Sequence, residues 1–480
     1  MNRRMIMHTL GRIMQLEAVL LIIPLAVALI YRETTALYFV LTAAGAAVFG
    51  VILTCIAHPR THVIYARDGF VLVALAWLFL SLFGALPFVL SGEIPSYVDA
   101  FFETVSGFTT TGASILPDPE VLSHGTVFWR SFTHWIGGMG ILVLCMAIVP
   151  SLSARSIHIM RAEMPGPIVG KLVPRARDTA KILYIIYIAM TLVQIIMLCF
   201  GGMSVFDSVV YSIGTAGTGG FANYATSCGS FSPYIQYTIT AFMLLFGINF
   251  NLYYLLIIRK GKSILKSEEL WAYFGIVCTS TVLITANIYP IYQNISDAVR
   301  HSSFQVATII STTGYSTTDF NLWPGFSKAI LLILMLIGAC AGSTAGGLKV
   351  SRVVLLIKMI GCNLRKLIHP RSVSTVKLEG KTVNDETQRS VANYFALYAL
   401  ILFSVFLVLS IEPFDLETNL SAAFSCFNNI GPGLGLVGPA SSYADYSILS
   451  KIVLSIAMLL GRLELYPVLF LLAPSTWVKK

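Results

Sequence analysis

The stretch Ser311-Thr312-Thr313-Gly314-Tyr315 follows a run of apolar and hydroxyl-bearing residues, and the same arrangement occurs three more times in the chain. We call these four stretches the Gly segments; they are 109–113 (TTTGA), 217–221 (GTGGF), 311–315 (STTGY) and 428–432 (NNIGP). Their anchor glycines, at 112, 220, 314 and 431, are 108, 94 and 117 residues apart. Each interval has room for two membrane-crossing helices and a re-entrant segment. The spacing therefore predicts four parallel repeats of helix, pore loop and helix around one pore.

Glycine at the anchor positions permits positive φ, so successive carbonyl groups can point into one axial pathway. The third Gly segment is similar to the Thr-Val-Gly-Tyr of potassium channels, in which backbone carbonyls replace the water shell of the ion. The alternative is that these glycines serve helix packing or turns, but four matches at equivalent places favour a pore. The predicted potassium-contacting residues, mainly through their carbonyls, are Thr110, Thr111, Gly112, Thr218, Gly219, Gly220, Thr312, Thr313, Gly314, Asn429, Ile430 and Gly431.

The composition is typical of a membrane protein. Of 480 residues, 56% are hydrophobic and 11% are charged, and the mean hydropathy is +0.78. A typical soluble domain has about 25% charged residues. The net charge of +9 comes from basic residues dispersed among the loops, so we expect contact with membrane lipid and not with nucleic acid. The eight cysteines stand singly, without the spacing of a zinc site.

Ten apolar runs are long enough to cross a bilayer; they lie near 16–31, 36–57, 70–90, 128–150, 182–200, 237–258, 270–291, 329–356, 391–411 and 452–473. Basic residues gather in alternate loops and beside both termini, which places those parts in the cytoplasm. The Gly segments lie in the other loops, which are rich in Asp and Glu and are expected to form acidic outer mouths that concentrate cations. We therefore divide the chain into a two-helix hairpin and four repeats: 1–62, 63–160, 161–262, 263–372 and 373–480.

The run Gly338-Ala339-Cys340-Ala341-Gly342-Ser343-Thr344-Ala345-Gly346-Gly347-Leu348-Lys349 interrupts the eighth apolar run with four glycines, so a helix should break there. Because it lies on the inner side of the pore loop in one repeat only, it is interpreted as a movable gate. Close helix packing through Gly342 and Gly346 is the alternative. A phosphate-binding loop is disfavoured, because Leu348 stands where that motif requires Lys. The candidate gating residues are Gly338, Gly342, Gly346, Gly347, Lys349 and Arg462.

Arg462 lies in the tenth apolar run, where an isolated cation costs about 2.5 to 3.5 kcal/mol on insertion scales. It is expected to face the pore or to hold the gate through its carbonyl groups. The alternative is a pair with Glu464, although residues two apart on a helix point to different sides. Arg130 and His134, one turn apart, are interpreted as outer-end residues and not as ligands. No arrangement of nucleophile, base or paired carboxylates stands out, so an enzyme is not expected.

Several longer motifs carry a family resemblance: Arg161-Ala162-Glu163-Met164-Pro165-Gly166-Pro167, residues 338–352, Leu367-Ile368-His369-Pro370, 428–433 and Gly461-Arg462-Leu463-Glu464. Through them the chain resembles the Trk/Ktr/HKT superfamily of potassium transporters, and the TrkH/TrkG branch in particular. The resemblance covers essentially the whole chain. Sodium-selective plant relatives carry Ser at the first anchor glycine, whereas Gly112 is intact here and favours potassium.

The resemblance implies a multi-pass protein of the bacterial inner membrane that takes up potassium through a gated, channel-like pore. It implies a homodimer with one pore per protomer and a TrkA-like cytosolic ring of nucleotide-binding subunits. Nucleotides would act through that ring, because this chain offers no site for them. A KdpA-like pump subunit shares the repeat plan, and an ion-coupled potassium symporter is the other alternative.

Overall fold

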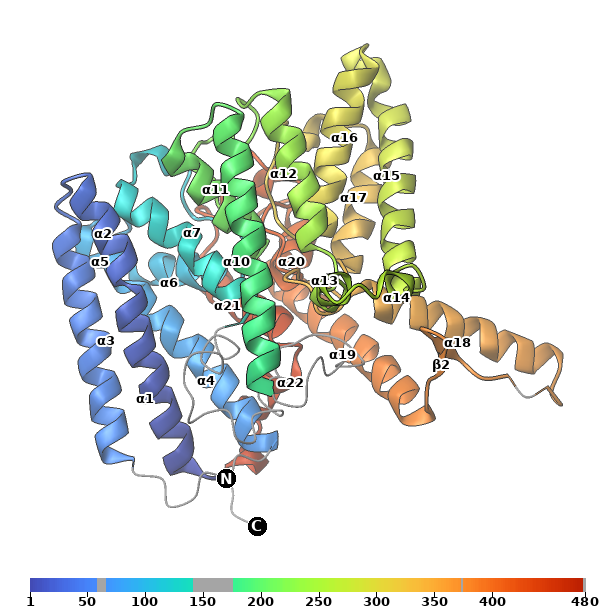
Figure 1. Cartoon of the computed structure of the whole chain (residues 1–480), viewed down its shortest axis with the longest axis horizontal. Helices are drawn as coiled ribbons and strands as arrows, with labels where there is room; N and C mark the ends of the chain where they lie inside the picture. The colour runs from blue at the N-terminus through green and yellow to red at the C-terminus, as the bar shows by residue number, and fades with distance from the viewer. Residues whose placement is uncertain (58–65, 141–175, 373, 478–480) are drawn as a thin grey trace.

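The computed structural model describes residues 1–57, 66–140, 176–372 and 374–477, and the regular structure in these residues is almost entirely helical (Figure 1). Strand structure in them is confined to one antiparallel hairpin of β1 (Lys377–Leu378) and β2 (Lys381–Thr382). The prediction of an all-α fold is therefore confirmed.

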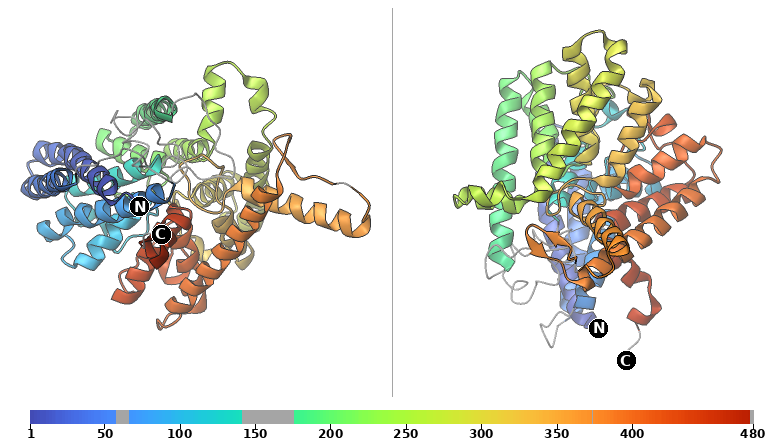
Figure 2. Two further views of the ribbon diagram at one scale, coloured as in Figure 1. Left: turned by 90° about the horizontal axis from the view of Figure 1, so that it is seen from below. Right: turned by 90° about the vertical axis from the view of Figure 1, so that its right-hand side faces the viewer.

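The N-terminal helices α1 (Arg3–Leu20), α2 (Ile22–Ile30) and α3 (Ala36–Ile56) form a hairpin at one edge of the molecule (Figure 2, left). Two glycines bring α1 and α3 together. A Cβ added at Gly11 would lie 2.7 Å from the carbonyl oxygen of Gly50, and one at Gly50 would lie 2.7 Å from that of Gly11. Packing of α1 against α4 (Ala66–Gly84) and of α2 against α7 (His124–Gly138) joins the hairpin to the rest of the molecule.

Six of the ten predicted crossings are helical segments long and apolar enough to span a membrane. They are Arg3–Ile30, Ala36–Ile56, Arg67–Ser91, Asp178–Phe200, Glu268–Tyr292 and Asp385–Leu409. The corresponding helices, beyond those already given, are α5 (Leu86–Ser91), α10 (Ala176–Phe200), α15 (Glu268–Tyr292) and α19 (Asp385–Leu409). The run 128–150 begins in α7, and its part from 141 onward lies outside the described residues.

The predicted crossing at 237–258 is not one straight helix. It consists of α12 (Pro233–Phe246) and α13 (Phe250–Ile257), which are bent by 91° relative to each other. The side chain of Asn249 caps α13 by accepting a hydrogen bond from the amide of Asn251 at 3.0 Å. A cap of this kind starts a new helix axis.

The predicted crossing at 452–473 is also broken, into α21 (Ile448–Arg462) and α22 (Tyr466–Leu472). Between them, Glu464 and Leu465 have φ of 55° and 67°, and Pro467 lies in the first turn of α22. The predicted break after α17 (Gly325–Ile337) is confirmed, and the chain becomes helical again in α18 (Val350–Ile368). The expectation that a helix breaks in only one repeat is therefore wrong.

Four short helices lie in the loops between the longer ones, and each runs directly into a Gly segment: α6 (Tyr97–Phe108), α11 (Val205–Gly217), α16 (Ile295–Ile310) and α20 (Leu416–Phe427). The remaining elements are α14 (Gly261–Ile264) and the 3₁₀ turns η1 (Pro119–Val121), η3 (Phe320–Leu322), η4 (Gly435–Val437) and η5 (Pro474–Thr476). α18 and the β-hairpin project from the body of the molecule on the side opposite the N-terminal helices (Figures 1 and 2).

Candidate functional site

The four short helices end in the same way. The second residue after α6, α16 and α20, and the first after α11, is left-handed, with φ of 56–57° at Thr110, Thr218, Thr312 and Asn429. The amide of the next residue bonds to the carbonyl five positions earlier, at 2.8 Å from Thr111 to Ser106, 3.0 Å from Gly219 to Gly214, 2.8 Å from Thr313 to Thr308 and 3.0 Å from Ile430 to Ser425. This is the Schellman end of a helix, here formed by Thr or Asn in place of the usual Gly. Because residues other than glycine rarely adopt a left-handed backbone, the sequence does not predict these four helix ends.

The anchor glycines bring the four Gly segments into a closed ring. All four have positive φ, from 75° to 102°. A Cβ added at each glycine would meet the carbonyl oxygen of the next segment, at 1.9 Å from Gly112 to Gly219, 1.9 Å from Gly220 to Thr313, 2.2 Å from Gly314 to Ile430 and 2.7 Å from Gly431 to Thr111. Only glycine allows this approach without displacing the neighbouring backbone. Each segment therefore lies beside the next, and the fourth lies beside the first.

A cavity of about 110 Å³ opens on one side of this ring. The four anchor glycines line it, together with polar groups that include Tyr443. The Tyr443 hydroxyl donates to the carbonyl of Gly431 at 2.8 Å, and its amide donates to the carbonyl of Ser114 at 2.8 Å. Tyr443 thus fastens the fourth segment to the residues that follow the first.

Acidic residues begin the four short helices, and all four have partners. Asp99 pairs with Lys451 at 2.6 Å, Asp297 with Arg300 at 2.8 Å and Glu417 with Lys328 at 2.8 Å, while Asp207 accepts from Asn223 at 2.8 Å. Their place in the first helical turn stabilises the helix dipole. These four carboxylates have local structural roles, so they add less free negative charge than the predicted acidic outer mouths require.

Residues 338–349, which we call the inner loop, lie against the other side of the ring. The amide of Gly346 donates to the hydroxyl of Thr312 at 2.7 Å, and both groups are buried. A Cβ at Gly346 would lie 2.5 Å from the carbonyl oxygen of Asn428. The inner loop therefore contacts two of the four Gly segments.

The inner loop is also bonded to the residues at the break between α12 and α13. The amide of Cys340 donates to the carbonyl of Gly247 at 3.1 Å, and the amide of Phe250 donates to the carbonyl of Gly342 at 3.0 Å. Glu269 of α15 accepts from the amides of Ala341 at 2.7 Å and of Ser351 at 3.1 Å, so it joins the inner loop to the start of α18. The bend that the sequence did not predict is thus where the inner loop is anchored.

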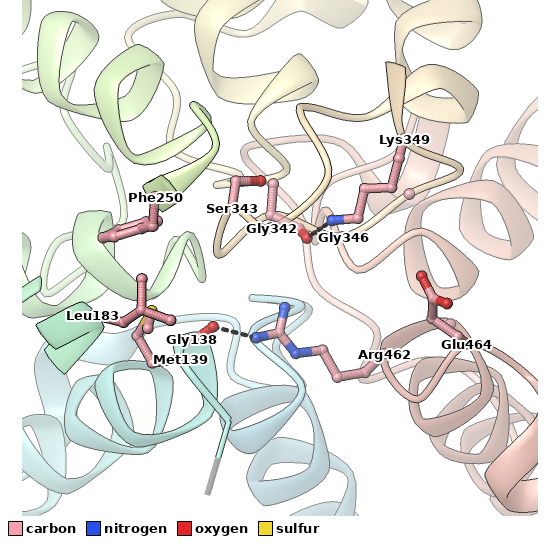
Figure 3. A pocket seen from close by; sticks show the side chains of 13 residues that line it. Gly138, Met139, Leu183, Phe250, Gly342, Ser343, Gly346, Lys349, Arg462 and Glu464 are labelled. Atoms are coloured by element: carbon pink, nitrogen blue, oxygen red, sulfur yellow. Dashed lines mark hydrogen bonds between the residues drawn. The ribbon is translucent and has the colours of Figure 1, made fainter. Parts of the chain in front are cut away.

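Arg462 bonds to three carbonyl oxygens, each at 2.6 Å. One belongs to Thr344 of the inner loop, and the others belong to Gly137 and Gly138 at the end of α7. Figure 3 shows the bond to Gly138. The guanidinium group therefore joins the inner loop to the end of α7 and to α21, which carries Arg462. This arrangement agrees with the predicted alternative in which Arg462 holds the loop through carbonyl groups.

Glu464 does not form the pair with Arg462 that the sequence left open. Its carboxylate pairs with Arg352 of α18 at 2.7 Å, and the Arg352 guanidinium lies 4.1 Å from the ring centre of Tyr394 in α19. Lys349 is buried and donates to the carbonyl of Ala345 within the inner loop (Figure 3). These basic groups therefore fix the end of the inner loop where α18 begins.

A cavity of about 30 Å³ remains between the inner loop, Arg462 and the end of α7 (Figure 3). Gly342, Gly346, Lys349 and Glu464 are among its lining residues. A space of this size holds no more than about two water molecules. An ion with a full water shell does not fit between the inner loop and Arg462 in this structure.

A bundle of apolar helices that encloses a ring of glycine-containing backbone is the architecture of an ion-conducting membrane protein. A family model described as "Cation transport protein" matches residues 38–479, and the chain belongs to this family, TrkH. The resemblance drawn from the motifs is confirmed, although Arg161–Pro167 lies outside the described residues.

Individual relatives match over their whole length. The chain is 36% identical to the Trk system potassium uptake protein TrkH of Escherichia coli K12, covering 99% of this chain and 100% of that protein. It is 33% identical to the Trk system potassium uptake protein TrkG of the same organism, covering 99% and 98%. The crystal structure of the potassium transporter TrkH from Vibrio parahaemolyticus matches with a TM-score of 0.90 at 34% identity, over 100% of both chains.

Proposed function

We propose that this chain takes up potassium across the bacterial inner membrane through a gated pore, and that it is not an enzyme. The observation that carries the proposal is the closed ring of Gly segments with the inner loop bonded directly beneath it. Relatives that share a third of its residues are named potassium uptake proteins. The ranges 63–160, 161–262, 263–372 and 373–480 each supply one Gly segment, and 1–62 is the added hairpin.

Potassium is the transported ion, and the backbone of the ring would receive it. The carbonyl oxygens that approach the next anchor glycine belong to Thr111, Gly219, Thr313 and Ile430, one from each segment. Their oxygens are fixed by the helix ends and by contact with the glycines, so they are positioned before an ion arrives. Such oxygens substitute for the water that a potassium ion loses on entry.

The inner loop acts as the gate in this proposal, with Arg462 as its fastening. The loop amide at Gly346 is bonded to Thr312, the loop carbonyl at Thr344 is bonded to Arg462, and Lys349 closes its end. The space beside these groups is too small for a hydrated ion. Transport then requires the inner loop to leave this position.

A cytosolic TrkA-like ring of nucleotide-binding subunits is the proposed source of that movement. α18 follows the inner loop directly and projects from the body, so a ring that binds it could pull on the loop (Figure 1). Arg365 and Lys366 lie in its last turn. We also propose a homodimer with one pore per protomer and both termini in the cytoplasm; the relatives that carry the name Trk system support a multi-component assembly.

The experiment that tests the gate is rubidium uptake into liposomes by a variant with part of Gly338–Gly347 deleted. The deletion should conduct without the cytosolic ring, whereas the wild-type chain should need it. A variant that elutes as a monodisperse species yet depends on the ring as strongly as wild type would place the gate elsewhere. Absence of rubidium flux in the wild-type chain with its ring would overturn the proposed function itself.

A further inference from the structure

A buried ion pair contacts the residues that follow the first and second Gly segments, and it has no part in the proposed gate. Glu103 of α6 and Arg130 of α7 meet at 2.5 Å, and their side chains are 0% and 4% exposed. Taking two charges out of water is costly unless further hydrogen bonds satisfy both groups. The other partners of the pair therefore indicate what it does.

The remaining bonds of Glu103 go to the residues that follow the first Gly segment. Its carboxylate accepts from the hydroxyl of Ser114 at 3.0 Å and from the amide of Ile115 at 2.9 Å. These residues lie two and three positions after Gly112. Glu103 thus fixes the backbone where it leaves the first segment.

The remaining bonds of Arg130 reach the second Gly segment. Its guanidinium donates to the carbonyl of Ala222 at 3.2 Å and lies 3.9 Å from the ring centre of Phe221. It also donates to the hydroxyl of Ser114 at 3.0 Å. Arg130 therefore connects the backbone leaving the second segment to the residues held by Glu103.

His134, one turn later on α7, makes a second connection between the same segments. Its Nε2 accepts from the amide of Phe221 at 3.3 Å, and its Nδ1 lies 2.7 Å from the carbonyl oxygen of Gly107 at the end of α6. These partners require a neutral ring that carries its proton on Nδ1. Both connections come from one rigid helix, so the first and second segments are fixed relative to each other.

The described connections between the residues that follow the other Gly segments are neutral, and the third and fourth are joined by the side-chain amide of Asn321, which donates to the carbonyl of Gly435 at 3.1 Å. The third segment is joined to the second through the amide of Cys228 and the carbonyl of Ser316 at 2.8 Å, and Tyr443 joins the fourth to the first. Among the ion pairs of the residues that the structure describes, Glu103–Arg130 is the one bonded to the backbone leaving the Gly segments. The arrangement is therefore asymmetric, with one charged brace.

We propose that Glu103 and Arg130 are positioning residues for ion selectivity. By fixing the first segment relative to the second, they set the distance between Gly112 and the carbonyl of Gly219, and so the size of the ion site on that side. This inference rests on the proposed potassium function. Without the charged brace the two segments can separate or approach, and the ring becomes able to close around a smaller ion.

Glu103→Gln is the first test, because it removes the charge and keeps the shape of the side chain. The matched control is Asp99→Asn, which removes the Asp99–Lys451 pair on the same helix, at 2.6 Å and away from the Gly segments. Sodium and rubidium fluxes are measured in liposomes with the cytosolic ring bound. The sodium-to-rubidium flux ratio should rise about tenfold in Glu103→Gln, the change that about 1.4 kcal/mol of relative affinity produces, and should stay at the wild-type value in Asp99→Asn.

A second variant keeps the test decisive if Glu103→Gln does not fold. Arg130→Lys retains the charge but loses the planar fork that reaches Glu103, Ser114 and Ala222 together. It should raise the flux ratio in the same direction. A normal flux ratio in a folded variant, with only a lower melting temperature, would overturn the positioning role while leaving the potassium function intact. An equal rise in Asp99→Asn would overturn it as well.

Discussion

The hydrogen bond from the Gly346 amide to the Thr312 hydroxyl ties the inner loop to the third Gly segment, and its loss should loosen the gate. The bond is 2.7 Å long, and both residues are buried. Thr312→Val keeps the branched shape at Cβ and removes only the hydroxyl. The perturbation therefore leaves the Gly346 amide buried without an acceptor whenever the loop is in its closed position.

The magnitude follows from that orphaned amide. A buried donor left without a partner costs about 1 to 3 kcal/mol, which is roughly a 5- to 150-fold change in an equilibrium constant. The cost falls on the closed state, because an inner loop that has moved away exposes the Gly346 amide to water. We expect rubidium uptake without the cytosolic ring to rise by about that factor in Thr312→Val.

Thr218 provides a control for any effect that a Thr-to-Val substitution has on the Gly segments themselves. Thr218 has the same left-handed backbone, with φ of 57° against 56° at Thr312, and is equally buried. Its hydroxyl bonds to the carbonyl of Gly217 at 2.6 Å and not to the inner loop. Thr218→Val should therefore leave rubidium uptake in the absence of the cytosolic ring near the wild-type value. An equal rise of this uptake in both variants, or no rise in Thr312→Val, would refute the reasoning. The Thr312 hydroxyl would then act within the ring of Gly segments and not on the gate.

Two further substitutions test the ring and the fastening of the gate. Gly112→Ser should admit sodium, because the new Cβ would lie 1.9 Å from the carbonyl oxygen of Gly219 and must displace that oxygen. Sodium and rubidium fluxes in liposomes measure the effect. Unchanged sodium exclusion with normal rubidium flux would contradict the prediction. Arg462→Ala should raise basal rubidium flux by at least about tenfold, because three carbonyl oxygens lose their charged donor; a flux that falls in step with protein abundance would instead make Arg462 structural.

The sequence was sufficient to predict the ring of Gly segments and the break after α17 because both depend on glycine. Positive φ at Gly314 and a helix interruption at Gly338 follow from a residue without Cβ, and such residues are visible in a sequence. The same logic fails for the break after α21. Glu464 and Leu465 have positive φ that nothing in their residue type favours, and the pair with Arg352 holds Glu464 in place.

The partners of charged residues were the least predictable part of the candidate site. Glu464 bonds to Arg352, which lies 112 residues away, and Glu103 bonds to Arg130 from another helix. Spacing along one helix predicts neighbours three or four residues apart, and it contains no information on contacts between helices. The ion pairs that fix the inner loop and the ring could therefore be read only from the folded chain.

The distribution of contacts on the inner loop supports the proposal that an external partner opens it. Its bonds reach the break between α12 and α13 through Gly247, the third Gly segment through Thr312, and α21 through Arg462. At about 1 kcal/mol net for each hydrogen bond, releasing four or five of them costs roughly 5 kcal/mol. A preference of about 5 kcal/mol for the closed position leaves roughly one molecule in 5,000 open, and opening 99% of the molecules would take about 8 kcal/mol of differential binding energy. Thermal motion therefore leaves the inner loop closed almost all the time, whereas a cytosolic ring that binds the open position more tightly by that amount can open it.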